Sequence, residues 1–170
     1  MPVLVPELSD SELRSQRAGW PPIGGPFYPS SLGGWRAELQ TRGRFRYLIA
    51  WIGGRPVGHV GLGLVDDRRI EDVCEWRGFA LVSDLEVMPS HRRLGAGRAL
   101  MEALEAEAVS AAMSGVALDT GTEESFAEAR GLYRSMGYVD RGEVFLGGWS
   151  DPQAPGRHFV DPLTQWFKRF

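Results

Sequence analysis

The chain has 170 residues, of which 43% are hydrophobic and 24% are charged, as in an ordinary globular protein. Its formal net charge of −3 argues against nucleic acid as the main partner, and the lone Cys74 excludes an internal disulfide. No apolar stretch approaches the roughly 18 residues that a membrane span requires, so we expect one cytoplasmic domain over residues 1–170 that contacts no membrane.

The first part of the chain predicts short elements around an irregular loop. Residues 3–5 are expected to form a strand, and residues 9–18 and 31–42 are expected to form two helices. Between these helices, residues 19–29 are rich in Gly, Pro and aromatic side chains and show no periodicity. We therefore predict a loop there.

Two strands follow, over residues 45–52 and 57–65, and Gly53-Gly54 supplies the positive φ of a tight hairpin turn between them. Three glycines in the second strand indicate a bulge or close packing. His59 has no sequence neighbours that complete a catalytic triad, so we expect it to be packed or at the surface. The charged segment 66–78 either attracts a cationic amine or is simply solvated surface.

The most informative stretch is a strand, a cationic turn and a helix. An apolar strand is predicted from Phe79 to about Met88 and stops at Pro89. After the turn, Gly95 and Gly97 open a long helix that continues to about residue 113. This order places the first turn of a helix directly after the end of a strand.

That arrangement predicts a binding site for phosphate groups. The first backbone N–H groups of a helix have no intrahelical partner and lie at the positive end of the helix dipole. Gly95 and Gly97 allow the backbone to approach a ligand closely, because no Cβ intervenes. Arg92, Arg93 and Arg98 add forked cationic donors that suit phosphate oxygens. A pyrophosphate is the expected ligand.

Two common phosphate loops do not fit this stretch. A nucleotide-hydrolysing P-loop needs Gly-Lys before Ser or Thr, and the only lysine of the chain is Lys168. A dinucleotide-binding fingerprint needs a third glycine, and Leu100 occupies that position.

The last part of the chain predicts alternating strands and one more helix. The helix is expected over residues 123–136, with Gly137 as its C-terminal cap. Pro162 within the last strand predicts an edge strand or a bulge. The strands are expected at residues 116–119, 144–146 and 158–167.

The spacing Arg92-x-x-Gly95-x-Gly97, between an apolar strand and a helix, resembles motif A of the GNAT superfamily of acyl-CoA N-acyltransferases. A second stretch, in which Ala129 precedes Leu132-Tyr133 and Met136-Gly137-Tyr138, resembles motif B. The two motifs cover about residues 81–113 and 115–138.

The resemblance implies an α/β GNAT fold: a mixed, mostly antiparallel sheet of six or seven strands that splays between strands four and five, with helices on both faces. It implies acetyl-CoA as cosubstrate, no metal, and an amine of a small molecule, peptide or protein as acceptor. The oligomeric state stays open between a monomer and a homodimer. The implied coenzyme-binding residues are Leu85, Val87, Arg92, Arg93, Leu94, Gly95, Ala96, Gly97, Arg98 and Phe126.

The resemblance also has implications for the catalytic acid, the pantetheine contact and the acceptor pocket. In the family, the tyrosine corresponding to Tyr133 lies by the coenzyme A sulfur and often protonates the departing thiolate. Phe126 replaces an asparagine that contacts the pantetheine arm in many relatives. The corresponding first loop often lines the acceptor pocket in the family, so Trp20, Phe27 and Tyr28 either do so here or cap the core.

The acceptor amine must lose a proton before it can attack, because an alkylammonium group has a pKa near ~10.4. Asp84 and Glu86 lie two residues apart, on one face of a regular strand, so either is a candidate general base. Two alternatives remain: a catalytically silent acyl-CoA sensor with the same fold, and a hydrolase built from Ser83, Asp84 and His91. The hydrolase lacks the Gly-x-Ser-x-Gly elbow.

Overall fold

The structure is a computed structural model, and it describes residues 3–6, 43–65, 76–150 and 158–170. The predicted helices at 9–18 and 31–42, the aromatic residues Trp20, Phe27 and Tyr28, and Cys74 lie outside these residues. The described strands are β1 (Val3–Pro6), β2 (Phe45–Ile52), β3 (Arg55–Leu64), β4 (Phe79–Val87), β5 (Gly115–Gly121), β6 (Val139–Ser150) and β7 (His158–Arg169). The helices are α3 (Ala96–Ser110) and α4 (Ala127–Ser135), with short 3-10 turns η3 (Pro89–His91) and η4 (Glu124–Phe126).

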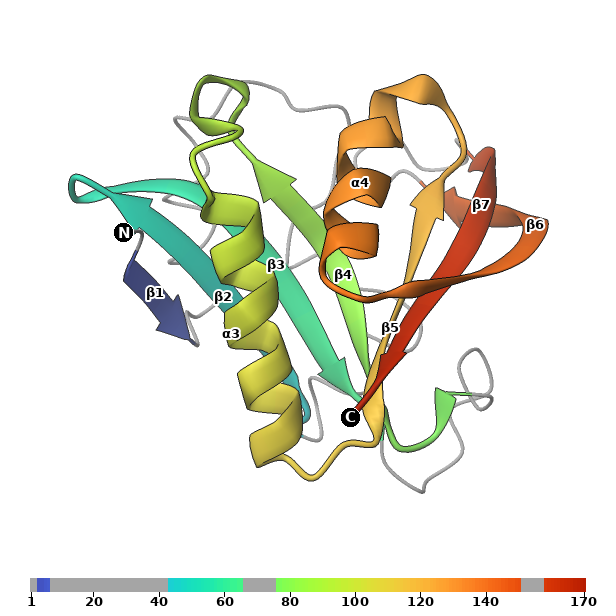
Figure 1. The fold of residues 1–170 in the computed structure, drawn as a ribbon, viewed down its shortest axis with the longest axis horizontal. Coiled ribbons are helices and arrows are strands. Elements are labelled where there is room, and N and C mark those ends of the chain that lie inside the picture. Colours follow the sequence, from blue (N-terminus) through green and yellow to red (C-terminus); the bar gives the residue numbers. More distant parts are fainter. Residues whose placement is uncertain (1–2, 7–42, 66–75, 151–157) are drawn as a thin grey trace.

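The strands form one seven-stranded sheet in the order β1-β2-β3-β4-β5-β7-β6 (Figure 1). Neighbouring strands pair antiparallel except β4 and β5, which are parallel and joined by the crossover through α3. The predicted mixed, mostly antiparallel sheet is therefore confirmed. Gly53 and Gly54 have φ values of 58° and 75° and form the predicted turn between β2 and β3.

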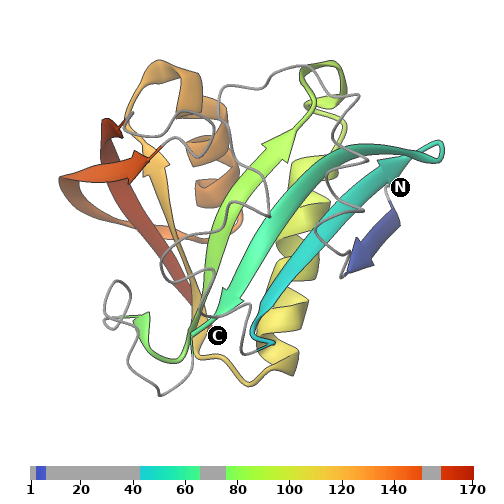
Figure 2. The same cartoon turned by 180° about the vertical axis from the view of Figure 1, so that it is seen from behind.

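Both described helices lie on the same face of the sheet, as Figures 1 and 2 show. Their inner side chains pack with one face of the strands in a core that includes Leu48, Val60, Leu62, Leu100, Leu104 and Trp166. A second cluster of buried side chains contains Phe45, Ile49, Val65, Phe79, Leu81 and Ala117. The helices predicted at residues 9–18 and 31–42, on which helices on both faces would depend, fall outside the described part of the chain.

The two helices are shorter than predicted, for local reasons. α3 ends at Ser110 because Ala112 has a φ of 56°, and the N–H of Met113 turns back to the carbonyl oxygen of Ala108 at 3.0 Å. The helix predicted from residue 123 begins at Ala127, after the tighter turn η4.

The prediction of an edge or bulge at Pro162 is wrong, because β7 lies between β5 and β6. Pro162 stands where the pairing with β5 ends: Gly121 pairs with Leu163, and the N–H of Thr122 donates to the carbonyl oxygen of Pro162 at 3.1 Å. The N and C=O of one strand residue face the same neighbour. The missing N–H of the proline therefore removes only the last bond of that ladder.

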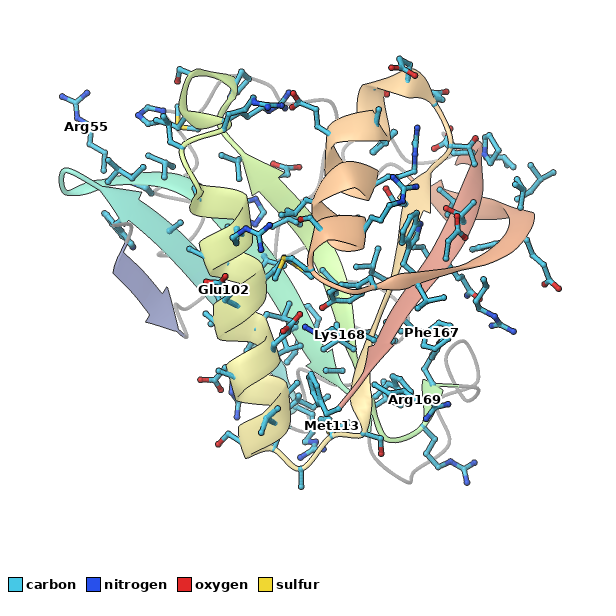
Figure 3. All side chains as sticks on the ribbon, in the orientation of Figure 1. Arg55, Glu102, Met113, Phe167, Lys168 and Arg169 are labelled. Atoms are coloured by element: carbon cyan, nitrogen blue, oxygen red, sulfur yellow. The ribbon has the colours of Figure 1, made fainter. Side chains whose placement is uncertain are left out.

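Side-chain contacts fix α3 against the second half of the sheet. The Nζ of Lys168 on β7 donates to Oε2 of Glu105 on α3 at 2.7 Å, and Figure 3 shows Lys168 beside this helix. Nearer the start of α3, Nη2 of Arg98 donates to Oγ of Ser135 at the end of α4, also at 2.7 Å. The first contact joins the second half of α3 to β7, and the second joins the start of α3 to the end of α4.

Candidate functional site

The candidate site is built on the place where β4 and β5 part. Among the described residues, β4 pairs with β5 at Phe79–Leu81, opposite Gly115–Ala117. From Leu118 onward β5 continues its pairing with β7, while β4 continues its pairing with β3. An opening therefore separates residues 82–87 of β4 from β5, as the splay prediction requires, and α4 lies over it in both ribbon views (Figures 1 and 2).

The backbone of Val87 faces this opening. The N–H of Met88 donates to the carbonyl oxygen of Val57 at 2.8 Å, and Val87 stands opposite Gly58. This pattern makes Val87 and Gly58 a non-hydrogen-bonded pair of the antiparallel ladder. The N–H and C=O of Val87 consequently point away from β3, toward the side on which β5 has parted from the sheet.

The turn after β4 leads directly into the start of α3. Nε of Arg92 donates to the carbonyl oxygen of Val87 at 3.3 Å, which fixes the turn on the end of the strand. Gly95 is the N-cap of α3, with a φ of 89°, and makes no side-chain capping bond. The first turn also contains no acidic residue. Its unpaired N–H groups are therefore available to an anion.

The remaining residues of the predicted coenzyme set surround this helix start. Arg93 and Leu94 are exposed, whereas Ala96 is buried in the core. Nη1 of Arg93 contacts Oε1 of Glu128 on α4 at 3.3 Å, an exposed pair that contributes little to stability. A Cβ added to Gly97 would lie 3.4 Å from Leu132 of α4, about an ordinary contact distance, so α4 covers this position of α3.

The carboxylates of β4 lie at a bulge. Gly61 stands opposite Ser83 and His59 stands opposite Glu86, so β4 has one more residue than β3 between these pairs. Asp84 has a φ of 54°, in the left-handed region, and accepts a hydrogen bond from Oγ of Ser83. The regular alternation that put Asp84 and Glu86 on one face is therefore interrupted. Glu86 lies 3.4 Å from Nε2 of the buried His59, measured from Oε2.

Tyr133 belongs to α4, the helix that lies over this opening, and its side chain is buried. It is 5% exposed, and its ring lies 6.0 Å from that of Tyr138 and 6.2 Å from that of Trp166, measured between centroids. Burial raises the pKa of the Tyr133 phenol well above its usual range, since the anion would lose its hydration. The phenol is therefore protonated at every physiological pH.

Phe126 lies at the end of η4, shortly after β5, and is 44% exposed. A Cβ added to Gly121 would fall 2.5 Å from its ring, so the ring covers the end of β5. Nη1 of Arg130 donates to the carbonyl oxygens of Gly121 and Glu123 at 2.6 and 2.8 Å. These contacts fix the segment from β5 to α4.

Three contributors to this site were missed or undervalued by sequence reasoning. His59 on β3 contacts Glu86 on the neighbouring strand β4, and Ser135 and Glu128 of α4 contact Arg98 and Arg93. Only the glycines around His59 pointed to a close approach there.

Comparison with known proteins identifies the family. The sequence model of the acetyltransferase (GNAT) family matches residues 8–138. An "IAA acetyltransferase" from Azospirillum brasilense is 32% identical over 134 residues, which cover 78% of this chain and 73% of that protein. The chain therefore belongs to the GNAT family, and by class it is an N-acetyltransferase that uses acetyl-CoA, as predicted.

Solved structures agree with the fold. The ribosomal-protein-alanine N-acetyltransferase from Brucella melitensis has a TM-score of 0.63 and 21% identity, covering 99% of both chains. A protein from Bacillus anthracis, solved in complex with acetyl coenzyme A, has a TM-score of 0.55 and 19% identity, covering 79% of this chain and 68% of that chain. At these identities the likeness concerns the fold.

In the part of the chain that the structure describes, no helix has the length and hydropathy of a membrane span. The same residues contain no group of three or more His, Cys, Asp or Glu side chains placed to hold a metal ion.

The raised phenol pKa predicts a loss of stability in alkali. Above about pH 10 an unfolded tyrosine releases its proton while the buried Tyr133 keeps it, so rising pH favours unfolding. The free energy of unfolding should fall by about 1.4 kcal/mol per pH unit for this residue. Urea unfolding at several alkaline pH values should show a shallower decline in Tyr133→Phe than in the wild type. Identical slopes would contradict the burial of an ionisable phenol there.

Proposed function

We propose that this enzyme binds the diphosphate of acetyl-CoA at the start of α3 and the pantetheine arm along β4, and transfers the acetyl group to a primary amine. The observation that carries the proposal is that two sets of backbone donors, with no partner among the described residues, follow one another along the chain. The Val87 amide faces the opening, and a few residues later the uncapped first turn of α3 begins. A thioester carrier has an amide-bearing arm and a diphosphate, which match these donors in the same order.

The diphosphate would be held mainly by the main chain. The N–H groups of the segment from Arg93 to Arg98 surround the proposed position, and Arg92, Arg93 and Arg98 supply compensating charge. Leu85 and Val87 would bond the pantetheine amides through their backbone, as an added strand does. Phe126 would offer the arm an apolar contact in place of the usual asparagine amide, because its ring is exposed at the end of β5.

The transfer requires a base, an oxyanion donor and an acid. Glu86 takes a proton from the ammonium group of the acceptor, and the resulting amine attacks the thioester carbonyl. The Val87 N–H stabilises the negative charge on the carbonyl oxygen of the tetrahedral intermediate. The intermediate collapses with cleavage of the C–S bond, and the Tyr133 hydroxyl protonates the departing thiolate. The attacking nitrogen gives up its second proton, which returns through solvent to the Tyr133 phenolate, and Glu86 releases its proton to solvent. The products are an N-acetylated amine and coenzyme A.

Glu86 is the better candidate base than Asp84. The side chain of Glu86 is 16% exposed, so an acceptor can reach it, and its partner is a histidine. Asp84 instead accepts a hydrogen bond from Ser83 within a backbone conformation that few residues adopt. We assign Asp84 to the shape of the bulge and Glu86 to proton transfer.

The acceptor is proposed only as a class. The named relatives act on different compounds, and their names carry over no further than an amine of a small molecule or of a peptide or protein terminus. Coenzyme A release measured against a panel of amines and N-terminal peptides tests the proposal. Coenzyme binding with no turnover on any member would favour the silent-sensor alternative. Phe126, at the position of the usual asparagine, is the sequence feature that supports this alternative.

The diphosphate site predicts a charge effect at Gly95. Its backbone is left-handed and nothing lies within 4 Å of an added Cβ, so a side chain there has space. Gly95→Glu should weaken coenzyme A binding roughly tenfold or more relative to Gly95→Ala, which shares the backbone strain without the charge. Calorimetry measures both affinities. Gly131→Glu, on an exposed position of α4, is the control for net charge. Equal affinities for the Glu and Ala variants of Gly95 would remove the diphosphate from this position.

The proposed acid and base predict losses of turnover without losses of coenzyme affinity. Tyr133→Phe and Glu86→Gln should each lower kcat by roughly 10²-fold, the lower end for general acid–base groups. Tyr138→Phe makes the same change on a neighbouring buried ring and should leave kcat within about threefold of wild type. Steady-state kinetics and calorimetry separate the two effects. A fully active Tyr133→Phe enzyme would eliminate the tyrosine as the acid.

A further inference from the structure

The burial of the His59 side chain on β3 should cost free energy. The side chain is 0% exposed, and an imidazole deep in a sheet is unfavourable unless its polar atoms are bonded. Its Nε2 lies 3.4 Å from Oε2 of Glu86, which stands directly opposite on β4. The proposed general base therefore has a buried histidine as a neighbour.

The bulge in β4 creates this pairing. In a regular ladder continued from Gly61 and Ser83, His59 would stand opposite Leu85. The extra residue at Asp84 shifts the register by one, so that Glu86 takes that place instead. A left-handed φ on a non-glycine residue is unfavourable, and here its consequence is that a carboxylate meets an imidazole.

Gly58 allows the two strands to approach at the same point. A Cβ on this residue would lie 2.8 Å from the carbonyl oxygen of Glu86 and 3.1 Å from Cγ2 of Val87. Any larger residue would push β4 away from β3 and lengthen the contact between His59 and Glu86. Gly58 and the bulge at Asp84 therefore both determine how close His59 lies to Glu86.

We propose that His59 is a positioning residue that holds the Glu86 carboxylate in the orientation from which it accepts the proton of the acceptor ammonium. This inference rests on the proposed role of Glu86 as the base. In the tautomer with hydrogen on Nε2, the imidazole donates to Oε2 of Glu86. A long, partly exposed glutamate is thereby restricted to one of its rotamers, and a misplaced base loses much of its rate advantage.

A set of substitutions separates orientation from simple packing. His59→Leu keeps apolar volume and removes the donor, so kcat should fall roughly tenfold or more while coenzyme affinity is unchanged. His59→Gln places an amide N–H near the position of Nε2, and should restore kcat to within about threefold of wild type. Leu64→Ala, also buried on β3 but away from Glu86, is the control for lost packing and should reduce stability without lowering kcat.

The deciding measurement combines His59→Leu with Glu86→Gln. If His59 acts through Glu86, the double variant should be no slower than Glu86→Gln alone. Losses that multiply would overturn the proposal and assign His59 to packing. An unaffected His59→Leu enzyme would overturn it as well, while leaving Glu86 as the base. If Glu86→Gln itself is fully active, the base assignment fails and the inference fails with it.

A second pair of variants tests the proposal if His59→Leu does not fold. If His59→Leu is insoluble, His59→Asn replaces it, because asparagine keeps an amide but is one bond too short to reach Oε2. Low kcat in the Asn variant beside nearly normal kcat in the Gln variant supports positioning. Equal activity of the two overturns it.

Discussion

The parting of β4 from β5 is the constraint on which the rest of the structure depends. Parallel pairing covers only Phe79–Leu81, and beyond it β5 bonds to β7 while β4 bonds to β3. The separation leaves main-chain donors of β4, that of Val87 in particular, facing an opening instead of a neighbouring strand. Unpaired backbone groups are costly in a buried position, so the end of this strand is suited to a ligand that supplies the missing bonds. The start of α3 follows the end of β4 after a short turn, and α4 lies over the opening.

Two faces of the sheet contribute to the proposed reaction. Leu85, Val87 and Tyr133 belong to the core beneath the helices. His59 alternates along β3 with Val60, which points into that core, so His59 and the Glu86 opposite it lie on the other face. The acid and the base would therefore approach a thioester from opposite sides, and only the opening between β4 and β5 allows them to do so. The bulge at Asp84 makes this possible, because it places a glutamate where the regular pattern would place Leu85.

Local chemistry determined which of these features could be predicted from the sequence. Gly53-Gly54, the stop at Pro89 and the start of α3 depend on backbone preferences of a few adjacent residues, and all three were found. Helical spacing predicted the buried position of Tyr133 on α4, and the structure confirms it. The role of Tyr133 as the acid came from the family resemblance and stays a prediction. The interior position of β7 was not predicted, because Pro162 suggested an edge strand. The pairing of β7 with β5 ends at Pro162, so the missing N–H of the proline removes only one bond, and the sequence does not reveal where that pairing ends. The pairing of His59 with Glu86 depends on a register between distant strands and on one extra residue, neither of which composition or periodicity records.

The central claim is that backbone amides at the end of β4 and the start of α3 bind the coenzyme. The most direct measurement is the change in amide nitrogen and proton chemical shifts of the labelled protein on titration with coenzyme A. The account predicts large shifts for Val87 and for the segment Gly95–Arg98, with small shifts in β1 and β2. Saturating coenzyme that leaves the amides of Val87 and Gly95–Arg98 unmoved would contradict it.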